Sequence, residues 1–553
     1  MSVCNRPRAS NLRPHSPNIS EVAVSVSPSY PGIYIQEVPS NSHTIVPAPT
    51  SIAAFVGYSH PFKTVAPGVA QQIFSFTDYE THFGGLFTSG LIDASLPRAV
   101  YQFFLNGGST AWVVGLQPGL FNDTKSVRFG NTATKLQFTV QVETDNKSTG
   151  MLFAALEPTD IVAMAVQIAN VNSTKSTFDL IVTYGSRIET YRGLRLTTES
   201  LATINAASDL VQVSPLNGNN TYGSKLPAPG LFPTALSPNP PLFDYTTSYL
   251  ASAFDEVFLP NSSLDNVEVI NLLLIPGNTD NQVLSTALSF AERKRAFAII
   301  DPPPHAPASG AKSASPQPIQ YWMTGVSGGT YELPTSQNGA LYFPYLTSTD
   351  PVTSTNIPMA PSGFVAGVYA ATDASRGVWK APAGLAAVVL NTAGPVPSGV
   401  MNDPQQGVLN HDSINCLRNF SGVGTVIWGA RTLVASNQAY QQSMYVPVRR
   451  MTLFIEQTLI ANLRWVVFEP NDTPLWVAIT SSVSAFMLSL FRQGALQGAT
   501  PSEAFQVKCD STTTTPADQA NGIVNIVVAF APLKPAEFVV IQIAQLAGQS
   551  AGA

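Results

Sequence analysis

The chain of 553 residues is longer than one hydrophobic core usually supports, so two to four domains are expected. Only 11% of its residues are charged, and the net charge of −6 argues against nonspecific binding of nucleic acid or anionic membrane. We expect other subunits to cover much of a surface so poor in charge.

The three cysteines are Cys4, Cys416 and Cys509. They lie far apart and lack metal-ligand spacing, so neither a disulfide framework nor a metal site is predicted. This favours synthesis in a reducing cytoplasm. The first segment, residues 1–29, is rich in Ser, Pro and Asn and has no apolar run, so we expect a flexible leader.

Residues 30–116 alternate between strand and helix patterns. Ile33–Val38 alternates well enough for a strand, and Ser51–Tyr58 resembles a buried one. A helix is predicted over Leu96–Asn106, followed by a buried strand at Ala111–Gly115. Strand, helix and strand in this order indicate α/β layering. The isolated strand at Ile33–Val38 is expected to pair with a distant segment.

Residues 117–264 are rich in Thr, Asn and Ser and contain alternating runs such as Leu136–Val142 and Phe178–Tyr184. This pattern predicts an inserted, mainly β domain that ends in a loop rich in Gly and Pro.

The α/β pattern resumes in residues 265–409. An apolar run at Val267–Pro276, a helical pattern near Asp280–Arg295 and a second apolar run at Ala296–Ile300 predict a βαβ unit with parallel strands. The residues from Pro361 to Tyr369 resemble a helix start. The predicted fold is therefore an α/β core made from both halves of the chain, interrupted by a β domain.

Residues 410–520 are expected to form a helical unit. Apolar spacing predicts a helix from Val448 to Leu463 and another after Pro474, with an acidic turn between them and Gly494 as a stop. The second helix has no charge up to Phe491 and barely meets the length of a membrane span, so packing against protein explains it better.

Residues 521–553 are expected to contain linking strands. Gly522–Phe530 and Glu537–Leu546 are apolar and β-prone. A run of this kind at a chain end is an aggregation hazard unless a partner pairs with it.

The catalytic motifs in the chain are weak. Gly325–Gly329 matches the nucleophile elbow around Ser327 after a possible strand at Tyr321–Thr324, but Pro334 blocks the required helix. His411 and Asp412 have no neighbouring nucleophile. The glycines at 422 and 424 come before a predicted strand, whereas the glycines of a dinucleotide site come after one. We expect no enzyme activity and no cofactor.

Several segments, in order and with their spacing, resemble contractile tail sheath proteins, the outer cylinders of contractile phage tails and of related injection machines. They cover the first hundred or so residues and nearly everything after about 265. The segments are Tyr30–Val38, Ala53–Ser59, Pro361–Gly384, His411–Leu433, Val448–Arg450, Trp465–Asp472 with Leu475 and Trp476, and Ala531–Ile543.

The resemblance implies a structural subunit that polymerises helically around an inner tube and contracts from a metastable extended state. Its partners would be further copies, the tube protein, and baseplate and cap proteins, without nucleic acid binding or membrane insertion. Assembly would occur in the bacterial cytoplasm, as part of a virion tail or an injection particle. The middle insertion resembles a variable knob on the outer surface.

The resemblance also implies that terminal strands are exchanged between subunits. The residues expected in these strands are Ile33, Tyr34, Ile35, Gln36, Glu37 and Val38 at one end, and Phe538, Val539, Val540, Ile541, Gln542 and Ile543 at the other. Six charged residues beside apolar helices are predicted either to pair within the fold or to reach the tube or a neighbour: Arg376, Arg431, Arg449, Arg450, Glu469 and Asp472.

Two other functions compete with this interpretation. A serine hydrolase would lose activity on Ser327→Ala while assembly stayed intact. A capsid-type protein would also self-assemble, but microscopy would show closed shells where a sheath gives cylinders.

Overall fold

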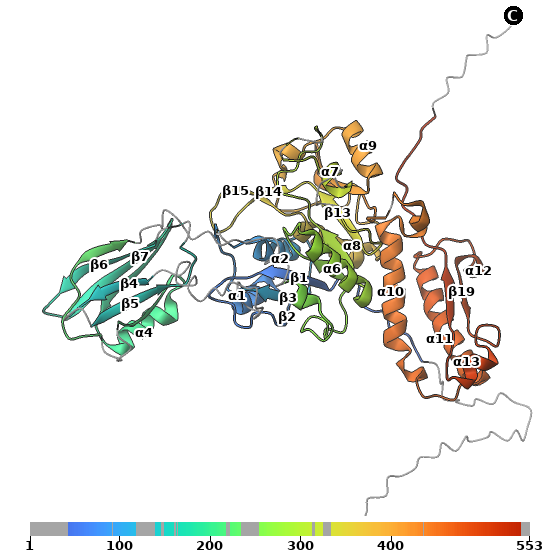
Figure 1. The fold of residues 1–553 in the computed structure, drawn as a ribbon, viewed down its shortest axis with the longest axis horizontal. Helices are drawn as coiled ribbons and strands as arrows, with labels where there is room; N and C mark the ends of the chain where they lie inside the picture. Colours follow the sequence, from blue (N-terminus) through green and yellow to red (C-terminus); the bar gives the residue numbers. More distant parts are fainter. Residues whose placement is uncertain are drawn as a thin grey trace, which may run out of the picture.

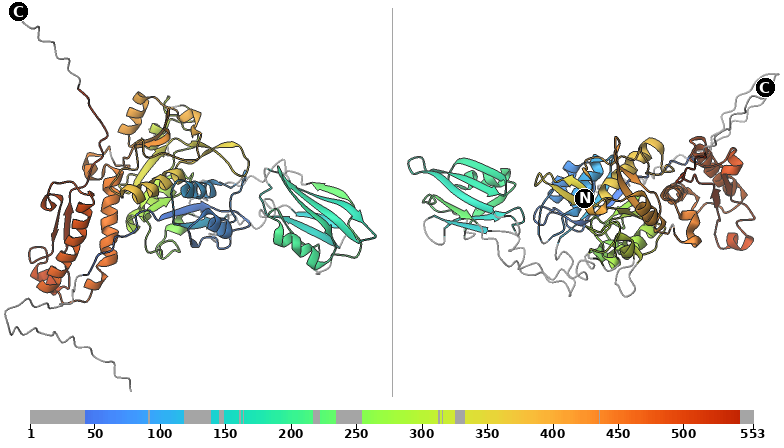
Figure 2. Two further views of the ribbon diagram at one scale, coloured as in Figure 1. Left: turned by 180° about the vertical axis from the view of Figure 1, so that it is seen from behind. Right: turned by 90° about the horizontal axis from the view of Figure 1, so that it is seen from above.

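The computed structural model describes residues 43–90, 92–117, 139–144, 149–159, 162, 164–216, 222–233, 254–311, 314, 316–324, 333–434 and 436–542. A β domain stands at one end of the molecule, the sheet-based core lies in the middle, and a helical layer forms the other end (Figure 1). Two further views keep the same order of parts (Figure 2).

The core is an eight-stranded sheet in the order β18-β17-β13-β12-β11-β1-β3-β2. Its inner strands run parallel, whereas β2 and β18 are antiparallel edges. The strands are β1 (Ala53–Tyr58), β2 (Ala70–Ile73), β3 (Ala111–Leu116), β11 (Leu272–Leu274), β12 (Phe297–Ile300), β13 (Gly339–Phe343), β17 (Ile414–Phe420) and β18 (Gly424–Trp428).

The predicted βαβ unit is confirmed, because β11 and β12 pair in parallel on either side of α6. Strand β1 pairs with β3 on one side and with β11 on the other, so residues before and after the β domain share one sheet. Strands β17 and β18 also belong to this sheet, which therefore continues past the boundary expected at residue 410.

Helices cover both faces of the sheet because its strands are apolar on both sides. Helices α2 and α8 pack on the face of Phe55 and Leu272, whereas α6 packs on the face of Val56 and Leu273. The elements around the sheet are α1 (Phe76–Phe83), α2 (Ser95–Leu105), α6 (Asn281–Lys294), α7 (Ile319–Thr324), β14 (Leu346–Thr349), β15 (Asn356–Met359), α8 (Ser362–Arg376), β16 (Gly394–Pro395), η2 (Pro397–Gly399) and α9 (Asp403–His411).

The inserted domain has its own apolar core between two antiparallel sheets and α4. Its sheets have the orders β10-β6-β7-β8 and β4-β5-β9. The elements are β4 (Thr139–Glu143), β5 (Gly150–Ala155), β6 (Met164–Asn172), β7 (Thr177–Tyr184), β8 (Arg187–Leu194), α4 (Thr198–Ala207), β9 (Val211–Pro215) and β10 (Gly230–Pro233).

One buried carboxylate joins this domain to the core. Glu157 lies 2.9 Å from Lys63 Nζ and 3.4 Å from Arg187, and its neighbour His60 is fully buried. Burial alone would raise the pKa of Glu157, but hydrogen bonding with His60 and the charge of Lys63 outweigh burial and lower it. The domain is thus held to the core by charge as well as by the chain.

The helical layer packs its own apolar core against the C-terminal hairpin. The predicted stripe Trp476, Ile479, Val483, Phe486 and Leu490 is buried there, although this helix is apolar and long enough to span a membrane by composition. The elements are η3 (Gln438–Ser443), α10 (Val446–Asn462), η4 (Arg464–Val466), α11 (Thr473–Arg492), α12 (Pro501–Ala504), β19 (Phe505–Lys508), α13 (Pro516–Ala520) and β20 (Val527–Phe530).

One interpretation of local structure is wrong. The possible strand at Tyr321–Thr324 is part of helix α7, whose residues Ile319 and Trp322 are buried in the core. The apolar run from Phe538 to Gln542 forms no strand within the described chain. The predicted pairing of this run is with another subunit, so it stays a prediction.

The contact between α2 and α8 depends on a glycine. A Cβ at Gly363 would lie 2.3 Å from the Ala99 carbonyl oxygen. We expect Gly363→Ala to lower the unfolding free energy by about 1–3 kcal/mol, because the backbones of α2 and α8 must move apart. The control is Gly407→Ala on the exposed helix α9, where an added Cβ would have nothing within 4 Å. In urea titrations this control should raise the unfolding free energy by about 0.5–1 kcal/mol. Equal effects of the two changes would contradict the proposed close approach.

Candidate functional site

The C-terminal root, residues 533–537, is held to the core through one carboxylate. Arg431 donates from Nε to Oε1 of Glu537 at 2.9 Å and from Nη2 to Oε2 at 2.7 Å. Asn410 Nδ2 donates to Oε1 at 2.6 Å, and the Tyr445 hydroxyl donates to Oε2 at 3.1 Å. A bidentate arginine with two further donors fixes the position and the direction of the chain here.

Three different elements supply these donors. Asn410 is near the end of α9, Arg431 follows β18, and Tyr445 is the N-cap residue of α10. Burial would raise the pKa of Glu537, but the hydrogen bonds from Arg431 and Asn410 and the Arg431 charge outweigh it and lower the pKa. The carboxylate is therefore ionised at neutral pH.

The chain leaves the protein surface directly after Glu537. The side chains of Phe538, Val539, Val540 and Ile541 are 75%, 80%, 84% and 79% exposed. These are the residues predicted to link subunits, together with Gln542; Ile543 lies outside the described residues. Four consecutive exposed apolar residues are unusual on a protein surface.

The N-terminal root, residues 43–48, is held at the other end of α10. Asn462 accepts from the Val46 amide at 2.9 Å and donates to the Val46 carbonyl at 2.8 Å. Thr458 Oγ1 accepts from the Ala48 amide at 3.1 Å, and the His43 ring stacks on Trp465 at 3.8 Å. The predicted strand Ile33–Val38 lies outside the described residues.

Helix α10 therefore connects the two roots. Tyr445 at its start contacts the C-terminal root, and Asn462 at its end contacts the N-terminal root. Seventeen residues at 1.5 Å per residue separate the roots by about 25 Å. Figure 1 shows the roots at opposite ends of this helix.

Buried arginines fix α10 against the core. Arg450 is 3% exposed and donates to both carboxylate oxygens of Asp373, at 2.9 and 2.6 Å, and to the Thr50 carbonyl. Its guanidinium lies over the Tyr369 ring at 4.7 Å. Arg449 donates to Asn338 at 2.8 Å, and burial lowers the pKa of Arg449. Arg431, Arg449 and Arg450 are thus bonded within the chain.

The other three predicted charged residues are exposed. Asp472 caps α11 by accepting from the Thr473 amide, and Glu469 lies in the turn before it. Arg376 ends α8 and makes no ion pair with any residue that the structure describes. The structure therefore brings Arg431 into contact with the C-terminal root and leaves Arg376 and Glu469 exposed.

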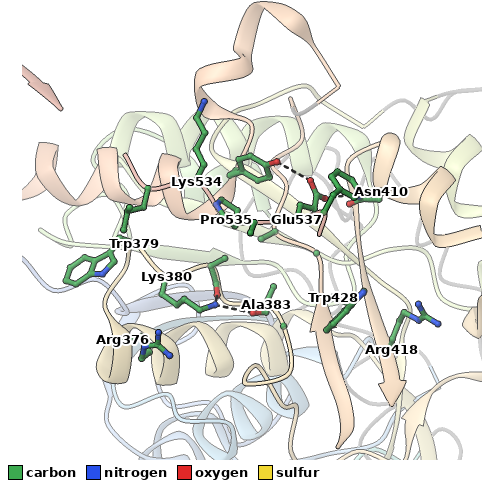
Figure 3. A pocket seen from close by; sticks show the side chains of 18 of the residues that line it. Arg376, Trp379, Lys380, Ala383, Asn410, Arg418, Trp428, Lys534, Pro535 and Glu537 are labelled. Atoms are coloured by element: carbon green, nitrogen blue, oxygen red, sulfur yellow. Dashed lines mark hydrogen bonds between the residues drawn. The ribbon is translucent and has the colours of Figure 1, made fainter. Parts of the chain in front are cut away.

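A cavity of about 1050 Å³ lies beside the C-terminal root. We call it the root pocket, and its lining includes Arg376, Trp379, Lys380, Trp428, Lys534 and Glu537 (Figure 3). Lys380 donates to the Ala381 carbonyl at 2.7 Å. Burial and the nearby positive charge of Arg376 lower the pKa of Lys380.

No catalytic arrangement is present among the described residues. His411 Nδ1 lies 3.0 Å from Asp412 Oδ1 on the surface, and the glycines at 422 and 424 form the turn between β17 and β18. Ser327 lies outside the described residues. Within the described chain, no group of three His, Cys, Asp or Glu residues could hold a metal ion.

Comparison with known proteins identifies the family. Residues 261–433 match the model of the phage tail sheath protein central domain, and residues 438–545 match that of the phage tail sheath C-terminal domain. Together these matches cover just over half of the chain. The chain belongs to the phage tail sheath family.

Two relatives match parts of this sheath family member. A prophage major tail sheath protein of Pseudomonas aeruginosa strain UCBPP-PA14 is 26% identical over 270 residues, or 48% of this chain and 62% of the relative. The tail sheath protein of Salmonella phage ViI is 27% identical over 153 residues, or 28% of this chain and 23% of the relative. The chain thus spans less than two thirds of either relative.

Solved structures share the fold. The helical sheath of the anti-feeding prophage in its contracted state gives a TM-score of 0.53 at 22% identity and covers 94% of this chain and 100% of that one. The PVC sheath complex of an extracellular contractile injection system, also contracted, gives 0.54 at 20% identity over 94% and 99%. A sheath tail protein of Desulfitobacterium hafniense gives 0.51 at 13% identity over 91% and 100%.

Apart from Arg431, the residues that hold the roots were not predicted from the sequence. Glu537 is the one acid in a run otherwise apolar from Pro535 to Ile541, a signal that could have been noticed. Asn462 carries no comparable signal, because its partner Val46 is 416 positions away.

Glu537 should stabilise the fold only while it is ionised. Its folded pKa is below the ordinary value of 4.5, so its contribution is present above that pH and is lost as pH falls further. We expect Glu537→Gln to lower the unfolding free energy by about 1.5–3 kcal/mol at pH 7, and the difference from the native chain to close in acid. Urea titrations at several pH values measure this, with exposed Glu469→Gln as a control expected to change little.

Breaking the ion pair of Arg450 and Asp373 should change the unfolding free energy more than Glu537→Gln does. We expect Asp373→Ala to lower the unfolding free energy by about 3–5 kcal/mol, because it leaves a buried guanidinium without its carboxylate. Adding Arg450→Met should recover much of this loss in the same urea titration. A double variant as unstable as the single one would contradict the assigned role of the pair.

Proposed function

We propose that the chain is the structural subunit of a contractile sheath, polymerising helically around an inner tube and contracting from a metastable extended state. The observation that carries this proposal is the exposed apolar segment Phe538–Ile541, held in place by Glu537. Membership of the phage tail sheath family supports it. Its role is structural, without catalysis or a cofactor.

The exposed segment is suited to strand addition on another copy. An extended segment that joins a neighbour's sheet gains main-chain hydrogen bonds worth about 1 kcal/mol each, and alternate side chains enter the interface. Burying Val539 and Ile541 would add roughly 1.5–3 kcal/mol for each side chain. Five residues therefore give a durable link between subunits.

The hairpin of β19 and β20 offers an edge for such a strand. The two strands pair antiparallel over Phe505–Lys508 and Val527–Phe530, and in the described chain each pairs with the other alone. Val527 is 51% exposed beside this edge. We propose that a terminal segment of a neighbouring copy, Ile33–Val38 or Phe538–Ile543, extends this sheet.

Arms that leave from opposite ends of one helix make contacts that do not close. A head-to-tail contact of this kind propagates as an open helix, which is the geometry of a tube wall. Contraction then needs two packings of one lattice, with the extended one held by the inner tube and the baseplate. The stroke uses energy stored at assembly, so it requires no nucleotide.

The proposed partners are further copies, the tube protein, and baseplate and cap proteins. The particle would be a virion tail or an injection device assembled in the bacterial cytoplasm. The exposed Arg376 and Glu469 are available for contacts with the tube or a neighbour, whereas the buried Arg450 is not. The β domain stands away from the helical layer, as a knob on the outer surface would (Figure 1).

Two matched truncations test the role of the C-terminal arm. A chain that ends at Glu537 should form no rods, because it lacks the linking segment, whereas a chain that ends at Ile543 should form rods like the full protein. Negative-stain electron microscopy of the purified proteins shows the difference as hollow striated rods. Circular dichroism should show that both truncated chains fold.

Other outcomes would contradict the proposal. Rods of normal length from the chain ending at Glu537, with its first 42 residues also removed, would show that the arms do not link subunits. Closed shells would favour a capsid-type protein. Hydrolase activity that Ser327→Ala abolishes would favour the enzyme.

A further inference from the structure

The turn between the two long helices holds a phenylalanine in an unusual conformation. Val467 has φ −70° and ψ 128°, Phe468 has φ +71°, and the Glu469 amide donates to the Val466 carbonyl at 3.2 Å. These are the features of a type II turn, whose third residue is normally glycine. We call Val466–Glu469 the tip turn.

No contact within the described chain compensates for the strained backbone conformation of Phe468. Its side chain is 102% exposed, and that of the neighbouring Val467 is 62% exposed. A bulky residue with positive φ is an outlier, and strain of this kind concentrates where a protein binds something. The stability of the isolated chain does not explain a phenylalanine here, which points to a partner surface.

The charge of the tip turn is negative. Glu469 is exposed, and the Asp472 carboxylate that caps α11 lies three residues further on. The nearest cation along the chain, Arg464, already pairs with Glu268. A partner should therefore present an aromatic-lined hollow with excess positive charge.

The root pocket of this same chain has that chemistry. Its carboxylates are already paired, Glu537 with Arg431 and Asp403 with Arg418 at 2.6 Å. Arg376, Lys380 and Lys534 have no carboxylate partner among the described residues (Figure 3). Trp379 and Trp428 add aromatic surface, and about 1050 Å³ is more than one phenylalanine side chain needs.

The two surfaces cannot meet within one copy. The tip turn precedes α11, whereas the root pocket includes Gln493 and Gly494 just after it. Twenty helical residues separate them by about 30 Å. A contact between them must therefore join two copies, and it must be head to tail, because the surfaces differ and lie at opposite ends of one layer.

We propose that Phe468 of one copy enters the root pocket of the next copy, with Glu469 facing Lys380 and Lys534. This contact rests on the proposed self-assembly and names a second interface beside the exchanged strands. It places an anchor directly against the C-terminal root, so a neighbour's tip turn would hold the segment from which the arm departs. Complementary charge then selects the register of the contact.

Disulfide cross-linking tests the contact in the full chain. In a Cys4→Ser background, Glu469→Cys combined with Lys534→Cys should give rods that oxidise to a ladder of covalent multimers on a denaturing gel. The buried Cys416 and Cys509 should not react. Each single variant should run as a monomer on the denaturing gel. The control pair Glu469→Cys with Arg192→Cys, which lies on the β domain, should give no ladder.

The outcomes separate this contact from the proposed function. Rods that give no ladder would overturn the contact while leaving the sheath function intact, and dimers from Glu469→Cys alone would indicate a two-fold contact in its place. Absence of rods from the native chain would count against the proposed function itself.

A second variant does not depend on cysteine chemistry. Phe468→Gly should leave the melting temperature of the unassembled chain unchanged or raise it, because glycine suits the left-handed position. It should also raise the protein concentration needed for rods by about tenfold or more, because it removes the anchor. The control Val65→Ala, at another exposed apolar residue, should change neither. A lower melting temperature, or rods at the native concentration, would overturn the proposal.

Discussion

The architecture depends on helix α10 being bonded at both of its ends to the segments from which the chain termini depart. At one end Tyr445 joins Arg431 and Asn410 around Glu537, and at the other Asn462 pairs with the Val46 backbone. Since a helix is stiff over this length, the two departure points keep a fixed spacing whatever the termini do beyond them. The buried pair of Arg450 and Asp373 ties the same helix to the core.

This arrangement separates rigid from adaptable parts of the subunit. The sheet, its covering helices and the α10–α11 layer bury continuous apolar surface, whereas Phe538–Ile541 exposes it. A lattice that changes its packing needs rigid units joined by links that survive rearrangement. Main-chain pairing suits such links because it depends little on side-chain identity.

Much of the fold could be predicted from the sequence because its patterns are local. The apolar runs that became β1, β3 and β12 predicted buried strands. The spacing of apolar residues predicted α10 and α11 within two residues at each start. The positions of β17 and β18 in the same sheet were not predicted, since pairing between distant strands leaves no local signal.

The site was harder to predict than the fold. Arg431 was proposed as a charged contact, but Glu537 and Asn462 gain their meaning only when segments far apart in the chain meet. The left-handed conformation of Phe468 was unexpected because the sequence places no glycine there. Helix α7 forms where the sequence also allowed a strand, because burial of Ile319 and Trp322 outweighed the local pattern.

The central claim is that the terminal segment is unpaired in the free subunit and becomes a strand in the assembly. Hydrogen–deuterium exchange at the amides of Val539–Ile541, measured in unassembled protein and in rods, tests it most directly. We expect rapid exchange in the free subunit and exchange slower by about 100-fold or more in rods. Equally rapid exchange in both states would contradict it.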